Sequence, residues 1–232
     1  MAVGEAILYS WRTNGRAGSS AGRLAGWLAG CGVGFASGRV AAPVEGDPGR
    51  HLIPPSDRSF VVPKGGGAMM FEASVREAIR GQFEAALKMF ELCVRACPSA
   101  QWDEPIAKYP FWQVAYHTIS FADLYLSPDE EAFELRDDLH PAGWDEFNLE
   151  YPSRRFDQDE ILGYIGLVRD TLRERIESET AESLEGGSGQ SHLPFRRIEL
   201  YLYTFRHIQH HTGQLSALLR RAGVETGWVK SG

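Results

Sequence analysis

Two histidines four residues apart, His207 and His211, are the part of this sequence best suited to chemistry. In a helix, residues at this spacing lie on one face with Cβ atoms about 5 to 6 Å apart. Both imidazoles can therefore reach one ion at the ~2.0 to 2.1 Å length of a zinc–nitrogen bond. Seven histidines in 232 residues can produce such a pair by chance, so the spacing alone does not establish a site.

The helical face that carries the pair strengthens the metal interpretation. Residues that recur at helical spacing around it form a stripe that should point into a core: Leu200, Thr204, His207, His211, Leu215 and Leu218. Burying two imidazoles without partners costs roughly a few kcal/mol each. Because one metal ion satisfies both rings at once, we predict a metal site here.

His117 is the expected third ligand. It shares one face of a predicted helix, from about Pro110 to about Leu126, with Val114, Phe121 and Leu124. A single histidine on an apolar stripe is more often a hydrogen-bonded core residue than a ligand. Three-histidine zinc sites, however, need a donor from another element, and this is the only other histidine on a predicted core face.

Four further histidines are interpreted as lying outside the site. His210 shares a face with Arg206 and should meet solvent or the mouth of a pocket. The others fall in the N-terminal segment or in loops beside prolines: His51, His140 and His192.

The three cysteines, Cys31, Cys93 and Cys97, are too few and too odd in number for a disulfide framework, which favours a reducing, cytoplasmic compartment. Cys93 and Cys97 are four residues apart but have no histidine near them in the sequence. We expect both to be small buried hydrophobes rather than metal ligands.

Composition excludes two broad classes. A net charge of -7 argues against a nucleic-acid partner, which would normally meet a basic face. No run of eighteen apolar residues is present, so we expect no membrane-spanning helix.

The periodicity of the apolar residues predicts four helices. They start near Phe71, Pro110, Asp157 and Pro194, and they end near Pro98, Leu126, Ser178 and Arg221. Asp157 should cap its helix together with Glu160, and Gly223 should stop the last one. With no convincing pair of strands, this pattern predicts an all-α four-helix bundle.

A long connection, residues 127–156, should join the second and third helices. Loops of this length are usually functional or disordered. Large apolar side chains should hold this one across the bundle: Phe133, Leu135, Trp144, Phe147 and Tyr151. Residues 185–189, rich in glycine, are expected to be a flexible link.

Residues 1–68 differ from the rest of the chain. They hold 14 of the 25 glycines and carry a charge of +3, which leaves -10 for the remainder. The segment has no sustained periodicity and cannot bury enough apolar area to offset its ordering entropy. We therefore predict a disordered extension over residues 1–68 and a bundle domain over residues 69–232.

Two other interpretations of the extension stay open. Residues 28–31 have the form of a lipoprotein cleavage box ending at Cys31, although the apolar region before it is short and broken by glycines. Codons for residues 64–66 can also encode a bacterial ribosome-binding sequence, which would make Met69 or Met70 the true start and residues 1–68 a translated leader.

The histidine motifs carry a family resemblance. The segments Ala115-Tyr116-His117-Thr118, Arg206-His207-Ile208-Gln209-His210-His211 and Gly213-Gln214-Leu215 resemble the DinB-like superfamily of bacterial, stress-induced metalloproteins, over about residues 69–223. The resemblance implies a homodimer of bundles with the long connection between helices 2 and 3. It also implies a divalent ion, commonly zinc or nickel, on His117, His207 and His211.

Relatives in that superfamily include thiol-dependent transferases, isomerases that use mycothiol, and hydrolases. We therefore expect a metal-dependent transferase that uses a low-molecular-weight thiol on a small-molecule substrate, with Gln214 approaching the open metal position. The alternatives are a metal-dependent hydrolase, a non-catalytic stress-induced binding protein with a structural metal, and a bundle without metal. No carboxylate lies at ligand spacing, which weighs against mechanisms that need a strong general base.

Overall fold

The computed structural model describes residues 67–232, with side chains from Ala73 onward. The predicted extension up to residue 66, including Cys31, lies outside the described residues, as does the side chain of Phe71. The described elements follow in order: α1 (Gly67–Ala96), η4 (Ser99–Gln101), β1 (Pro105–Ile106), β2 (Tyr109–Pro110), α2 (Phe111–Leu126), η5 (Gly143–Phe147), α3 (Gln158–Ser178), α4 (Ala181–Glu185) and α5 (Arg197–Arg221).

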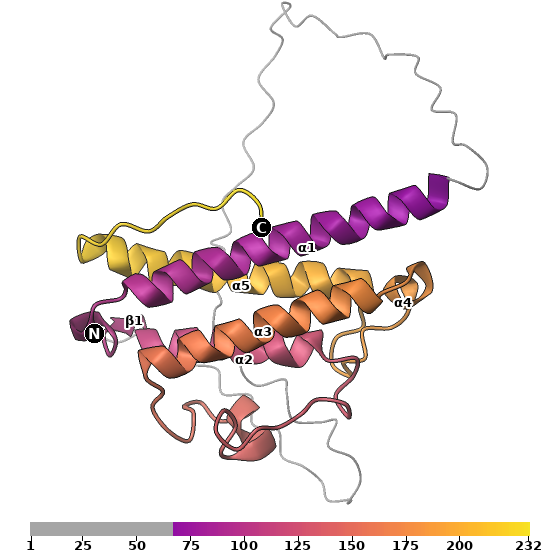
Figure 1. Ribbon diagram of the computed structural model, residues 1–232. Coiled ribbons are helices and arrows are strands. Elements are labelled where there is room, and N and C mark those ends of the chain that lie inside the picture. The colour runs from indigo at the N-terminus through magenta and orange to yellow at the C-terminus, as the bar shows by residue number, and fades with distance from the viewer. Residues whose placement is uncertain (1–66) are drawn as a thin grey trace, which may run out of the picture.

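The four long helices pack side by side as a bundle (Figure 1). Helix α1 contacts α3 and α5, and α2 contacts the same two helices, so α1 and α2 lie diagonally opposite. The predicted all-α four-helix bundle is confirmed, with the long connection between α2 and α3. Within residues 67–232, a pair of two-residue antiparallel strands, β1 and β2, lies just before α2, and an isolated bridge joins Gly187 to Arg196.

Helix α1 presents the predicted apolar stripe to the core. Phe83, Leu87, Phe90 and Val94 are fully buried, and the helix ends at Ala96, two residues before Pro98, which could not continue it. The helix begins at Gly67, two residues before the predicted domain start. The pattern of apolar residues could not predict the first residue of the helix, because the ends of helices are not defined by buried side chains.

Helix α2 is buried on every side along all sixteen residues. Two faces meet α3 and α5, and the long connection covers the outer face, where Phe133 and Phe147 pack against Phe121 and its neighbours. The predicted packing of the connection is confirmed for these two side chains and for Leu135 and Trp144, which are partly buried against the same cluster. It is wrong for Tyr151, which is 48% exposed because its ring lies against Tyr109 at the surface.

The ends of α3 and α5 follow local chemistry. The predicted capping box of Asp157 and Glu160 is present at the start of α3, and Gly223, with φ of 78°, ends α5 as expected. Helix α5 starts at Arg197, three residues after the predicted Pro194. The segment before it is extended, because Ser188 N–H donates to the Phe195 carbonyl at 2.9 Å.

The glycine-rich stretch after α3 is not the free link that its composition suggested. It follows the short helix α4, and Ser188 and Gln190 are buried. Gly189 has φ of 78°, and a Cβ there would lie 2.0 Å from the Pro128 carbonyl oxygen. Because Gly189 has no side chain, its backbone can lie close to that of Pro128. The residue serves this close approach rather than flexibility.

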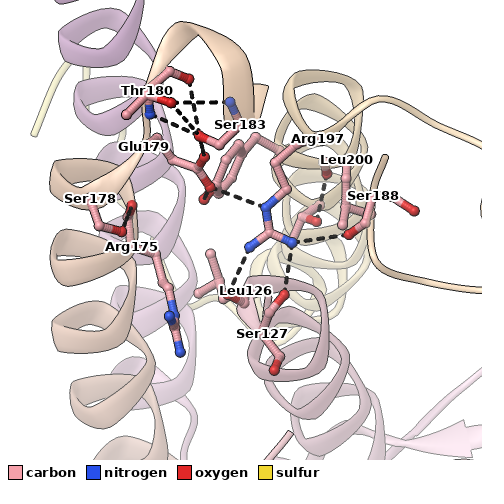
Figure 2. A network of polar contacts seen from close by, with 12 residues as sticks. Leu126, Ser127, Arg175, Ser178, Glu179, Thr180, Ser183, Ser188, Arg197 and Leu200 are labelled. Atoms are coloured by element: carbon pink, nitrogen blue, oxygen red, sulfur yellow. Dashed lines mark hydrogen bonds and ion pairs between the residues drawn. The ribbon is translucent and has the colours of Figure 1, made fainter. Parts of the chain in front are cut away.

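A buried arginine joins α2, α5 and the segment after α3 (Figure 2). The Arg197 guanidinium donates to the carbonyls of Leu126 (3.0 Å), Ser127 (2.7 Å) and Ser188 (3.1 Å), and to Glu179 Oε1 at 3.2 Å. Although burial raises the pKa of Glu179, hydrogen bonds from Ser183, Tyr201 and Arg197 hold it below its ordinary value. The network satisfies carbonyls at the end of α2 that have no partner within the helix.

A chain shortened to Met69–Gly232 is expected to keep a cooperative thermal transition. Every side chain in the two apolar clusters belongs to residue 79 or a later one, so the shortened chain retains the whole described core. Circular dichroism on the full and shortened chains tests this directly. Loss of cooperativity on shortening would show that the domain boundary is misplaced.

Candidate metal centre

The packing of α2 against α5 brings the three predicted histidines together. His117 projects from α2, and His207 and His211 project from successive turns of α5. Their side chains expose only 5, 9 and 6% of their surface, and one ligand atom of each lies within 4.8 Å of the other two. Among the described residues, this is the one group of three or more metal-ligating side chains that meets these distances.

The imidazoles face one another as ligands of one ion would. Nε2 of His117 and Nε2 of His207 are 3.1 Å apart, close to the ~3.3 Å that separates two nitrogens bound tetrahedrally at zinc–nitrogen bond lengths. The three rings meet nearly edge to face, at interplanar angles of 73, 84 and 82°. The residues present therefore fit a divalent ion.

Burial keeps these rings neutral. It lowers the pKa values of His117 and His207 well below the ordinary range, and each is lowered further by a neighbouring histidine. Burial also lowers the pKa of His211 to about 4. Neutral imidazole is the form that binds metal, so no proton competes for these ligands at neutral pH.

Gln214 lies behind one ligand. Its Oε1 accepts the Nδ1 hydrogen of His211 at 2.8 Å, which leaves Nε2 of that ring with a lone pair for an ion. The structure thus places Gln214 Oε1 where it can orient the His211 ring, and the predicted approach of Gln214 to an open metal position stays a prediction. A catalytic role for this residue stays a prediction.

The neighbouring histidine on α5 does not join the cluster. His210 is exposed, as predicted, and touches only the outer side of the site, with its ring centroid 5.0 Å from that of His211. The Phe121 ring packs against the cluster, with its centroid 4.6 Å from that of His117. The cluster therefore has an aromatic neighbour from α2 and an exposed histidine beside it on α5.

Comparison with known families agrees with this geometry. A model of the DinB superfamily matches residues 82–215, a range that contains all three histidines. The chain belongs to the DinB superfamily. A search of curated proteins and a search of solved structures each found no match.

Two other predictions about this DinB-superfamily chain concern its cysteines and membranes. Cys93 and Cys97 are buried and free, and burial raises their pKa values to about 11 and 12, which disfavours the thiolate that a metal would need. In the part of the chain that the structure describes, no helix combines the length and apolar character of a membrane span.

A small cavity adjoins His117 on the side of the long connection. It encloses about 10 Å³, room for about one water. Gln113 and Ser120 of α2 line it together with Glu146 and Phe147 of η5.

A second buried polar cluster lies beyond Phe147. Tyr164 Oη donates to Asp123 Oδ2 at 3.0 Å and lies 2.9 Å from His140 Nε2, while His140 Nδ1 accepts the Arg136 backbone N–H. The sequence placed His140 in a loop. It is in a loop, but it is 2% exposed, because these bonds anchor the connection to α3.

Metal-free protein should lose stability as the pH falls from about 6.5 to about 4. Burial lowers the pKa of His140 to about 4, so the unfolded chain takes up that proton first and stability falls by up to about 1.4 kcal/mol per pH unit. His117, His207 and His211, whose pKa values burial also lowers, each add a contribution of the same sign, whereas Asp123, whose pKa burial raises, opposes them. Urea unfolding at several pH values measures the slope, which His140→Asn should reduce; an unchanged slope would contradict the assignment.

Gln214→Leu is expected to weaken metal binding about tenfold without removing it, because the variant leaves His211 Nδ1 without its orienting acceptor. Titration against a metal-binding dye gives the affinity. Unchanged affinity combined with a large loss of activity would favour a direct catalytic role for Gln214 instead.

Proposed function

We propose that this chain binds one zinc or nickel ion through His117, His207 and His211 and uses it to transfer a low-molecular-weight thiol to a small electrophile. The observation that carries the proposal is the convergence of three neutral, nearly buried imidazoles from two helices. Three protein ligands are typical of catalytic zinc sites, in which a further position stays open to water or substrate.

A divalent ion held by His117, His207 and His211 would supply Lewis acidity, which would lower the pKa of a bound thiol or water toward neutrality. Neutral imidazoles would leave the charge of such an ion uncompensated. In the transfer, the thiol proton passes to solvent and sulfur forms a bond to an electrophilic carbon. The leaving group departs with the electron pair of its former bond to that carbon.

The hydrogen bonds accepted by Glu146, the carboxylate that lines the cavity beside His117, favour thiol transfer over hydrolysis. Hydrolysis gains from a general base within reach of the attacking water. Glu146 accepts hydrogen bonds from the backbone N–H groups of Ala142 (3.0 Å) and Ser153 (3.1 Å) and from the Ser153 hydroxyl. The carboxylate oxygens of Glu146 are thus engaged in hydrogen bonds that stabilise the long connection. A thiol of lowered pKa, in contrast, needs no general base.

The test combines metal analysis with a screen of thiols, including glutathione, bacillithiol and mycothiol, against 1-chloro-2,4-dinitrobenzene. We expect thiol-dependent turnover by metal-loaded protein and none by His207→Ala. Hydrolysis of p-nitrophenyl acetate serves as the comparison reaction. Metal that raises thermal stability without supporting turnover of any thiol would indicate a structural ion and contradict the proposal.

A further inference from the structure

The three histidines of the metal centre are nearly closed off from solvent. His117, His207 and His211 expose only 5, 9 and 6% of their surface. The cavity that adjoins His117 encloses about 10 Å³, room for about one water and too little for an organic thiol. A thiol that approaches His117 through this cavity therefore needs part of the cavity wall to move.

The wall of this cavity is thin on one side. Leu149 is 40% exposed and Pro152 is half-buried, so these two lining residues separate the cavity from solvent. All other lining residues are buried and belong to α2 or η5. Neither Leu149 nor Pro152 belongs to the apolar clusters of the described core. A movement of residues 149–152 would therefore open the cavity without unpacking the bundle.

Residues 149–152 lie between two points that are fixed to η5. Before the segment, Nδ2 of Asn148 donates to the Trp144 carbonyl at 3.1 Å. After it, the N–H of Ser153 donates to Oε2 of Glu146 at 3.1 Å. Because both ends are bonded to η5, the residues between them can move as one short segment.

A buried side chain holds the middle of this segment to α2. Gln113 is fully buried, and its Nε2 donates to the Glu150 carbonyl at 2.6 Å. The Glu150 side chain also pairs with Lys108, but the two side chains are 52 and 61% exposed, and an exposed ion pair contributes little. A hydrogen bond from a buried donor is costly to lose, so the bond from Gln113 is the stronger restraint.

We propose that residues 149–152 form a gate over the cavity beside His117, and that the hydrogen bond from Gln113 to the Glu150 carbonyl keeps this gate closed. The inference rests on the proposed function and adds to it the route by which the thiol reaches the metal. When the bond breaks, the segment moves away from the cavity while α2 and η5 keep their places. Opening of the gate then limits the rate of thiol binding.

The first experiment fixes the gate in its closed position. In the full chain with Cys31→Ser, Lys108→Cys and Glu150→Cys are joined after folding by a short bis-maleimide, which leaves every side chain that lines the cavity unchanged. The protein is loaded with cobalt(II), whose sulfur-to-metal charge-transfer absorption reports binding of 2-mercaptoethanol in a stopped-flow instrument. We expect the bridge to slow thiol binding by about tenfold or more.

The matched control is a bridge at the base of the long connection. Asp103 and Arg155 also form an exposed ion pair between the segment before α2 and the connection, but Arg155 lies beyond Ser153 and outside the gate. Asp103→Cys and Arg155→Cys, joined by the same reagent, should leave the rate of thiol binding unchanged.

The second experiment releases the gate. Gln113→Leu removes the donor to the Glu150 carbonyl and should speed thiol binding about tenfold. Gln190→Leu is its control, because Gln190 is also buried and donates from Nε2 to a backbone carbonyl, but does not line this cavity. It should keep the wild-type rate, and Gln113→Met repeats the test if the leucine variant fails to fold.

Cobalt content, measured on every sample, separates the possible failures. Full loading with an unchanged rate after bridging of residues 108 and 150, or equal slowing by the two bridges, would overturn the gate and leave the proposed function intact. Fully loaded wild-type protein that shows no charge-transfer absorption with the thiol would overturn both.

Discussion

Replacing His117, His207 or His211 by alanine is expected to reduce bound metal from about one ion per chain to nearly none, because each supplies one of the three donors of a zinc-type site. His210→Ala is the matched control, since His210 is adjacent on the same helix but exposed and outside the cluster. It should keep the ion. Elemental analysis of the four variants beside wild-type protein measures this.

The three alanine variants should still fold. An ion bound only by the native state adds about 2.7 kcal/mol to the free energy of unfolding at a hundredfold excess over Kd. The apolar core remains when the ion is absent. A chelator should therefore lower the melting temperature of wild-type protein and leave those of the three variants unchanged. Loss of metal from His210→Ala together with its retention by His211→Ala would show that the helical face is wrongly assigned.

Arg197→Met is expected to lower the free energy of unfolding by about 3 to 5 kcal/mol. The substitution leaves Glu179, only 7% exposed, as a buried carboxylate without its cation. It also leaves the carbonyls of Leu126, Ser127 and Ser188 without the guanidinium that now satisfies them. Urea unfolding with the metal-free protein gives the difference.

Arg196→Met provides the comparison for that measurement. Arg196 is the neighbouring arginine, and its partners Glu185 and Glu199 are exposed, so its loss should matter far less. The double variant Arg197→Met/Glu179→Gln should recover part of the stability, because it removes the unpaired charge. Equal effects of the two single arginine substitutions would show that the buried network does not hold α2 to α5.

The bundle and the three histidines could be predicted because both depend on helical periodicity. Spacing places His207 and His211 on one face of a helix, and the same reasoning turns His117 toward a core. The 3.1 Å distance between Nε2 of His117 and Nε2 of His207 could not be predicted from spacing, because it depends on how α2 packs against α5. The match to the DinB superfamily covers residues 82–215, which include all three histidines.

Residues whose environment is built by distant segments escaped prediction. Arg197 is a charged residue and would ordinarily be placed in solvent, yet carbonyls from the end of α2 gather around it. Gln113 is a polar residue, yet it is fully buried, and its side chain donates to the Glu150 carbonyl of the long connection. The glycine-rich composition around Gly189 suggested a flexible link, whereas in the structure this glycine allows the backbone to pass close to Pro128.

The most direct test of the metal centre is anomalous X-ray scattering from a crystal of zinc-loaded protein, recorded on both sides of the zinc absorption edge. We expect one strong peak per chain, between α2 and α5, at ~2.0 to 2.1 Å from one ring nitrogen each of His117, His207 and His211. A peak elsewhere, or none between these three rings in protein shown to contain zinc, would contradict the account.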